Sequence, residues 1–235
     1  MSSSGGSLIT LNISSTDVRV LEVRGGKVRV WGDAPLEPGA VRGGRILKPS
    51  AVAAVIDELF TRLKLSRDAV LVSLTGMSFT YRVIEMPDMK RSMLQEAMER
   101  SAAREIPVSL DELYLSWQSI GSHQGQHDYF LLGVPREPIS ALAQTLTEAQ
   151  IKNFEVDLRA LALARLANRA NAMVVSLEED LYNIVLVSRG VPAVLHTVMP
   201  RTGEEARLED NFQRCADELN KTGTFHNLSY PDHRI

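Results

Sequence analysis

The stretch PSAVAAVIDELFTRLKLSRDAVLVSL, residues 49–74, decides the fold class. It opens on Pro49, a residue suited to the first turn of a helix. Its apolar residues then recur at spacings of three and four, as on one face of an amphipathic helix. They are Val52, Val55, Ile56, Leu59, Phe60 and Leu63. The end of the stretch, Val70–Leu74, is apolar nearly throughout, as expected of a strand covered by helices on both faces. A helix followed by a buried strand predicts a mixed α/β fold.

The residues before this stretch predict a β-meander. Leu8–Ile13 is a short apolar run, and in residues 18–24 apolar and charged side chains alternate. The pair Gly25-Gly26 then separates this run from Val28 and Val30. Two β-rich runs around a glycine pair are typical of a hairpin, because glycine adopts positive φ without a steric cost. Three antiparallel strands therefore precede the helix.

A smaller unit follows the buried strand. Phe79–Glu85 alternates like a strand, and Lys90–Arg104 carries apolar residues on one helical face. Leu113–Ile120 and Tyr129–Val134 are two further strands joined by a polar turn. The order is strand, helix, strand, strand.

The last part of the chain returns to longer elements. We predict a strand at Phe154–Leu158 and a helix at Ala160–Arg169. Three strands and a final amphipathic helix follow, at residues 172–175, 182–187, 193–198 and 202–220. The predicted organisation is a flexible tail at 1–7, a main domain made of 8–77 and 151–235, and an inserted small subdomain at 78–150.

Composition narrows the classes of partner. The 235 residues carry a formal net charge of -3, so no general attraction to nucleic acid or anionic lipid is expected. A single cysteine, Cys215, excludes an internal disulfide and favours a reducing compartment, the cytoplasm. No run of about 18 apolar residues is present, so we expect no direct membrane insertion, and any membrane role must go through a partner.

Four sequence motifs resemble motifs of the PilM family, which is part of the actin/FtsA-like superfamily with an RNase H-like main domain. The first is R-x-I-x-M-P-x-M at Arg82–Met89. The others are the IP and DE pairs at residues 106–112, YFLLGVPRE at 129–137 and EVDLRALALA at 155–164. The resemblance runs from about Leu8 to Ile235. It implies an actin-like fold with an inserted subdomain, and it leaves no room after Thr202 for the family's second large domain, which we expect to be missing.

The resemblance also implies two hairpins that would grip the phosphates of ATP-Mg²⁺. Each needs a turn glycine, which lets backbone amides approach the phosphate, and an aspartate for the metal. The family pattern D-x-G-S-S-x-x-K falls on residues 12–19 and D-x-G falls on 176–178. The remnant positions are Asn12, Ser14, Ser15, Thr16, Arg19, Ser176 and Glu178. Like charges 4 Å apart cost about 4 kcal/mol at an effective dielectric of 20. Loss of both glycines and the first aspartate, with an acidic second turn, therefore predicts a degenerate ATPase site, with no cofactor and no catalytic residue.

For function, the resemblance implies a cytoplasmic scaffold of a type IV pilus or related secretion platform, peripheral to the inner membrane through its partners. It would bind the cytoplasmic tail of a bitopic PilN-like protein in the groove between main domain and inserted subdomain, and it could form a homo-oligomer. The candidate partner-binding residues lie in Met77–Met86 and Ser92–Arg104. They are Phe79, Tyr81, Arg82, Val83, Met86, Met93 and Met98. Two alternatives remain: an active ATPase of the same family that binds ATP-Mg²⁺, and a GspL-like or FtsA-like membrane-associated scaffold.

Three other features favour structural roles. His123 and His127 lie in a Gly/Gln/Ser turn, where a solvated loop is favoured over a metal site. The acidic run 178–180 is interpreted as a solvent-facing turn rather than a cation site. Cys215 lies on the apolar face of a helix, which indicates a core residue rather than a nucleophile.

Overall fold

The computed structural model describes residues 7–178, 181–199 and 207–229. Of the expected tail 1–7, residues 1–6 lie outside this part, and Ser7 is the first residue of strand β1.

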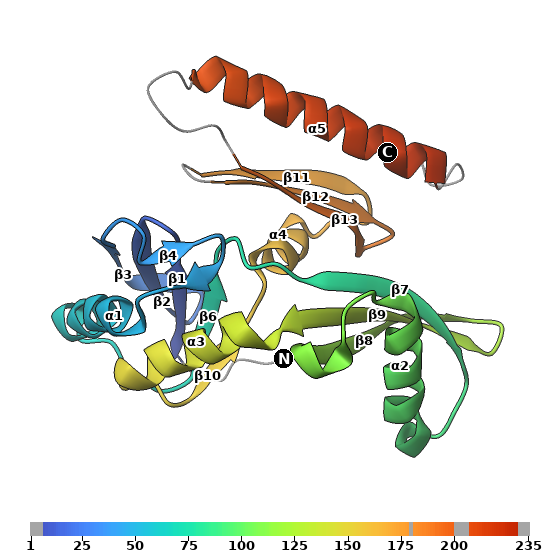
Figure 1. Ribbon diagram of the computed structural model, residues 1–235, viewed down its shortest axis with the longest axis horizontal. Coiled ribbons are helices and arrows are strands. Elements are labelled where there is room, and N and C mark those ends of the chain that lie inside the picture. The colour runs from blue at the N-terminus through green and yellow to red at the C-terminus, as the bar shows by residue number, and fades with distance from the viewer. Residues whose placement is uncertain (1–6, 179–180, 200–206, 230–235) are drawn as a thin grey trace.

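A five-stranded sheet with the order β10-β6-β1-β2-β3 forms the first half of the fold (Figure 1). Strand β2 is antiparallel to both β1 and β3, whereas β6 runs parallel to β1 and β10 runs parallel to β6. The bounds are β1 (Ser7–Ile13), β2 (Asp17–Arg24), β3 (Lys27–Pro35), β6 (Val70–Leu74) and β10 (Phe154–Val156). This is the meander, the buried strand and the returning strand that the sequence predicts.

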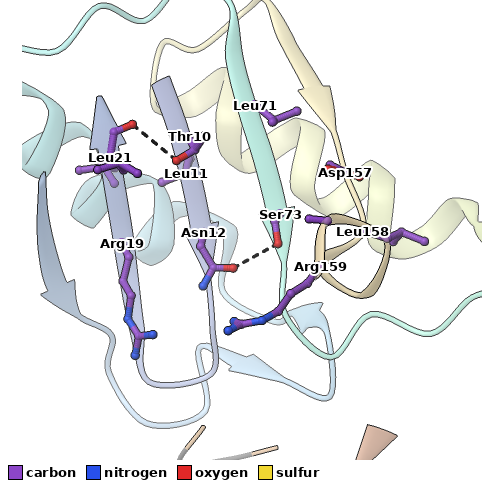
Figure 2. Close-up of a pocket in the computed structure, with 12 residues that line it drawn as sticks. Thr10, Leu11, Asn12, Arg19, Leu21, Leu71, Ser73, Asp157, Leu158 and Arg159 are labelled. Atoms are coloured by element: carbon purple, nitrogen blue, oxygen red, sulfur yellow. Dashed lines mark hydrogen bonds between the residues drawn. The ribbon is translucent and has the colours of Figure 1, made fainter. Parts of the chain in front are cut away.

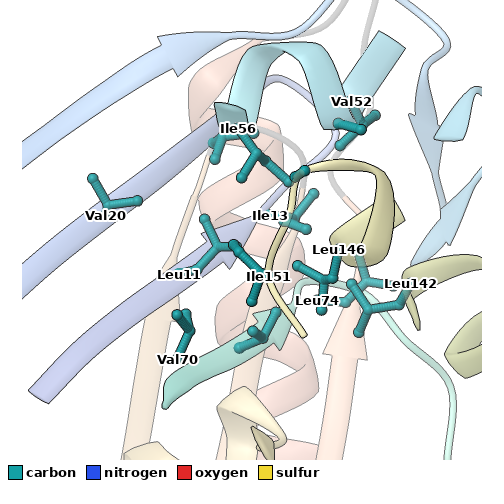
Figure 3. Close-up of a cluster of buried hydrophobic side chains, with 14 of the residues drawn as sticks. Leu11, Ile13, Val20, Val52, Ile56, Val70, Leu74, Leu142, Leu146 and Ile151 are labelled. Carbon is teal, nitrogen blue, oxygen red and sulfur yellow. The ribbon is translucent and has the colours of Figure 1, made fainter. Parts of the chain in front are cut away.

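Two helices cover one face of this sheet, α1 (Pro49–Leu63) and α3 (Arg136–Glu148). Alternate residues of β1 point into this core, and Ile9, Leu11 and Ile13 are at most 2% exposed. Figure 3 shows how side chains from both helices and from β1, β2 and β6 meet there. A two-stranded ribbon, β4 (Val41–Arg42) with β5 (Arg45–Ile46), precedes α1. Sequence patterns do not predict it, because each strand has only two residues.

The inserted subdomain has its own sheet and its own small core. Its strands are β7 (Thr80–Pro87), β8 (Leu113–His123) and β9 (Gln126–Pro135), in the order β7-β9-β8. Helix α2 (Arg91–Glu105) and the 3₁₀ turn Leu110–Glu112 pack against it. The order strand, helix, strand, strand is confirmed. The expected limits 78–150 are too wide, because the side chains Leu142 and Leu146 of α3 are buried in the main core instead.

The chain from residue 159 onward builds a second unit rather than extending the main domain as expected. Strands β11 (Ala172–Leu177), β12 (Tyr182–Ser188) and β13 (Val191–Val198) form a separate antiparallel sheet. All residues of β12 are buried, because α4 (Arg159–Ala167) covers one face and α5 (Leu208–Ser229) the other (Figure 1). Hydrophobic periodicity indicates that a strand is buried, but not which sheet it joins, and this explains the wrong assignment.

Within the described ranges, no helix combines the length and the apolar character needed to cross a membrane.

Candidate functional site

The turn of the β1–β2 hairpin and the end of β11 meet at one place, although they belong to different sheets. Arg19 near the start of β2 and Arg159 at the start of α4 both contact the carboxylate of Glu178, the residue that follows β11. The fold therefore brings together the two hairpins at which the family pattern has its phosphate-binding turns. Their chemistry decides whether a nucleotide fits between them.

Ser14, which is only 1% exposed, forms the hydrogen bonds that hold the first turn together. Its Oγ accepts hydrogen bonds from the backbone N–H groups of Thr16 at 3.1 Å and Asp17 at 2.9 Å. The hydroxyl itself donates to Asp17 Oδ1 at 2.7 Å, and the N–H of Ser14 donates to the carbonyl of Asp17 at 2.9 Å. These three amides are thus used inside the turn. In a phosphate loop such amides would point toward the ligand.

Asn12 lies just before this turn and is held by two hydroxyl groups. Its Oδ1 accepts hydrogen bonds from Ser73 Oγ at 3.2 Å and Thr75 Oγ1 at 3.0 Å (Figure 2 shows the first). A neutral amide therefore stands where the family pattern has the aspartate that holds Mg²⁺, and its oxygen is turned toward protein hydroxyls. A carbonyl oxygen without negative charge is a weaker ligand for this hard cation than a carboxylate.

The second turn inserts a buried negative charge between two arginines. The side chain of Glu178 is 9% exposed; one carboxylate oxygen is in contact with Arg159 Nη2, and the other lies 3.8 Å from Arg19 Nη1. Arg159 also donates to Ser176 Oγ at 3.2 Å, and Arg19 is held by Asp17 Oδ2 at 2.7 and 3.0 Å. The interpretation of Glu178 as part of a solvent-facing turn is wrong, because ion pairing with both arginines compensates the burial of its charge. The other acidic residues, 179 and 180, lie outside the described part of the chain.

A cavity of about 270 Å³ opens beside this network (Figure 2). Figure 2 shows Arg19 on one side and Arg159 on the other, with Asn12 between them on β1. Thr10, Leu21 and Leu71 also line the cavity. Small-molecule sites usually measure about 300–1,000 Å³. This cavity lies just below that range, and the cations at its mouth are already paired with carboxylates.

The candidate partner-binding residues separate into three environments. Tyr81, Arg82 and Val83 line a groove of about 780 Å³, but this groove lies between the inserted subdomain and the second sheet rather than beside the main domain. Phe79 packs between the main core and the core under β12.

The methionine candidates also divide. Met86 and Met98, 5% and 0% exposed, are buried in the core of the inserted subdomain, because α2 covers that face of its sheet. As partner-binding residues these two are wrong. Met93, on α2, is 58% exposed and lies apart from the residues that line the groove.

His123 and Cys215 are the two residues at which metal or thiol chemistry was considered. His123 lies at the end of β8, with Nδ1 3.6 Å from Asp128 and Nε2 3.9 Å from Glu85. One possible ligand atom from each of Glu85, His123 and Asp128 lies within 4.8 Å of the others, and Glu85 and His123 are exposed. Burial raises the pKa of the Cys215 thiol, which packs against β12 and β13 from α5. Its role as a core residue fits this environment.

Comparison with known proteins identifies the family. The model of the family described as type IV pilus assembly protein PilM matches residues 10–199. A solved PilM-PilN type IV pilus biogenesis complex is similar, with a TM-score of 0.70 at 20% identity over 95% of this chain and 71% of that chain. The cytoplasmic domain of EpsL, an inner-membrane component of the type II secretion system of Vibrio cholerae, gives a TM-score of 0.56 at 14% identity over 83% and 72%.

At such identities the solved structures establish the fold alone, and a search of curated protein sequences found no match. The family model, however, covers well over half of the residues. The fold is therefore actin-like, and the chain belongs to the type IV pilus assembly protein PilM family.

Proposed function

We propose that this chain is a cytoplasmic scaffold of a type IV pilus assembly platform at the inner membrane, that it binds the cytoplasmic tail of a PilN-like protein, and that it works without bound nucleotide. The observation that carries the proposal is Glu178, a buried carboxylate that occupies the space between Arg19 and Arg159. The protein supplies its own anion at the place where the family pattern would receive a phosphate.

The energetic argument rests on competition between Glu178 and a phosphate. A triphosphate that uses Arg19 and Arg159 must first displace the carboxylate, and it finds the amides of Thr16 and Asp17 already bonded to Ser14. Separating a partly buried ion pair costs about 2–3 kcal/mol. That cost alone lowers the affinity by about a hundredfold, and the like charge of Glu178 adds to it.

The scaffold part of the proposal rests on the family and on the groove. PilN is the partner named in the similar complex, and the groove lined by Tyr81, Arg82 and Val83 is large enough for an extended segment. We assign the tail of a PilN-like protein to this groove. The single cysteine and the lack of a basic surplus agree with a cytoplasmic protein that reaches the membrane through this partner.

Isothermal calorimetry tests both parts with one protein preparation. The 235-residue chain is titrated with ATP-Mg²⁺ and, separately, with a synthetic peptide of the cytoplasmic tail of the PilN protein from the same organism. We expect no heat of binding from ATP-Mg²⁺ at millimolar concentration and saturable binding of the peptide. A scrambled peptide of the same composition is the control. Saturable nucleotide binding without peptide binding would overturn the proposal.

The likeness to EpsL favours a second candidate, a scaffold of the GspL kind in a type II secretion platform. Its partner would be a different inner-membrane protein. The same calorimetry with cytoplasmic segments of type II secretion components from that organism distinguishes the two, because binding to these and not to the PilN tail would favour the second candidate.

A further inference from the structure

Strand β13 has a free edge that faces the inserted subdomain. Within the described residues it pairs with β12 alone, and the pairing shifts by one residue, since Leu186 pairs with Val194 and Val187 with Pro192. Ala193 therefore has no partner residue on β12. Exposed strand edges present backbone N–H and C=O groups that can pair with another chain.

A side chain, not a strand, meets this edge. The hydroxyl of Tyr81 donates to the carbonyl of Ala193 at 3.2 Å and accepts from the N–H of Leu195 at 3.1 Å. These are one acceptor and one donor of the β13 backbone, the same two groups that a neighbouring strand would use. The Tyr81 ring is fixed by stacking on Phe130 at a centroid distance of 5.6 Å.

The groove of about 780 Å³ includes Tyr81 and Ala193 of this contact in its lining, together with apolar and positively charged residues. Val83, which is 55% exposed, and Pro192 supply apolar surface from opposite sides. Arg82 lies on one wall and Arg189 on the other. Among the described residues, neither guanidinium forms an ion pair with a carboxylate, although Asp128 lines the groove farther along.

We infer that the groove receives an extended peptide that adds to the free edge of β13 and takes over the backbone groups now held by the Tyr81 hydroxyl. The peptide recognised by this chemistry is an extended apolar segment with an acidic residue, which pairs with Arg82 or Arg189. Main-chain hydrogen bonds give such a segment affinity, and the apolar and charged contacts give specificity. The inference rests on the proposed function, because it assigns a binding mode to the proposed tail site.

The substitution Tyr81→Phe tests this exchange, since it keeps the stacked ring and removes only the hydroxyl. The peptide then has no hydroxyl to displace. Each hydrogen bond contributes about 0.5–1.5 kcal/mol net, so we expect the PilN tail peptide to bind about two- to tenfold more tightly than to the unchanged protein. Tyr114→Phe, on the exposed part of β8, is the matched control and leaves the affinity unchanged.

Hydrogen exchange of the Leu195 backbone amide, measured by NMR, reports directly whether the edge of β13 is hydrogen-bonded. In free Tyr81→Phe protein this amide loses its acceptor and exchanges faster than in the unchanged protein. On binding of the tail peptide it becomes protected again. The contribution of charge is tested by Arg189→Glu, which is expected to weaken binding by about tenfold. Arg24→Glu, at the exposed end of β2, is the control.

The outcomes separate the binding mode from the function. Peptide binding that leaves Leu195 exchanging fast in the Tyr81→Phe protein overturns the edge addition and leaves the scaffold proposal standing. Equal or weaker binding to Tyr81→Phe than to Tyr114→Phe also overturns the edge addition. Absence of peptide binding to the unchanged protein and to Tyr81→Phe overturns both.

Discussion

The two hairpins, with turns at Ser14 and Glu178, depart from the family's phosphate-binding pattern in different ways. In the first, Ser14 closes the turn through hydrogen bonds to residues two and three positions away. In the second, Glu178 reaches out of its own sheet to Arg19, on the first hairpin, and to Arg159, at the start of α4. The first change is local and the second links distant parts of the chain.

This difference shows that an anion site can be removed by two independent means. A turn whose amides are bonded internally no longer presents donors to a phosphate. A carboxylate between two cations neutralises the charge that would attract one. The hydrogen bonds of Ser14 stabilise one hairpin, whereas the ion pairs of Glu178 also connect the second sheet to the first. We therefore expect changes at Glu178 to affect the whole molecule more than changes at Ser14.

The largest effect is expected from Glu178→Gln. The substitution removes the carboxylate charge that contacts Arg159 and lies near Arg19, whereas Asp17 still pairs with Arg19. We expect the free energy of unfolding to fall by about 3 kcal/mol, measured by urea denaturation. Glu137→Gln, which breaks an exposed pair with Arg45, is the control and should cost less than about 0.5 kcal/mol. Equal costs for the two variants would contradict the buried link.

The two arginines that pair with Glu178 differ in exposure, so replacing each of them should cost a different amount of stability. The side chain of Arg159 is 24% exposed and that of Arg19 is 48% exposed, and Arg19 keeps Asp17 as a second partner. We expect Arg159→Gln to cost about 2 kcal/mol and Arg19→Gln about 1 kcal/mol, because solvent screens the more exposed pair. Urea denaturation of both variants and of the double variant measures their coupling. Strictly additive costs would show that the two arginines do not share Glu178.

A smaller effect is expected from Ser14→Ala. The amides of Thr16 and Asp17 lose their acceptor, but water reaches this turn, since Thr16 is exposed. We expect a loss of about 1 kcal/mol. Ser140→Ala, which removes an exposed hydroxyl that donates to the carbonyl of Arg136, serves as the control and should be nearly neutral. A cost as large as that of Glu178→Gln would reverse the ranking of the two hairpins.

The smallest effect concerns the attachment of α5 to the second sheet. The hydrogen bond from Lys221 lowers the pKa of Glu218, which also lies 3.3 Å from His196 of β13. Because the pKa in the folded protein is below its usual value, the contribution is present at neutral pH and is lost as the pH falls through that lowered pKa. Glu218→Gln should therefore reduce the melting temperature slightly at pH 7.

The melting curves at low pH provide the check on this last prediction. At a pH below the lowered pKa of Glu218, where the carboxylate is protonated in both the folded and the unfolded state, the unchanged protein and Glu218→Gln should melt at the same temperature. A difference that persists there would mean that the substitution acts through packing rather than charge.

Much of the fold could be predicted from local sequence patterns. The spacing after Pro49 gives α1, and the apolar run Val70–Leu74 gives β6, with the same limits. The unit β7-α2-β8-β9 was also predicted in the right order. These elements have strong periodicity and clear turn residues, so their local signals agree with their tertiary environment.

What sequence could not supply is the pairing between distant parts. The remnant positions Asn12 and Glu178 were found, but Arg159 was not, because a single arginine at the start of a helix carries no signal of its partner at the end of β11. The division into two sheets was missed for the same reason. Met86 and Met98 were misplaced because an apolar residue in a strand or helix can face either a core or a groove, and only the position of α2 decides.

A crystal structure determined after soaking with ATP-Mg²⁺ at millimolar concentration tests the central claim most directly. The account predicts that the carboxylate of Glu178 remains in contact with Arg159 and close to Arg19, with no triphosphate between the turns at Ser14 and Glu178. A triphosphate seated there, with Glu178 displaced and Arg159 on the phosphate oxygens, would contradict it.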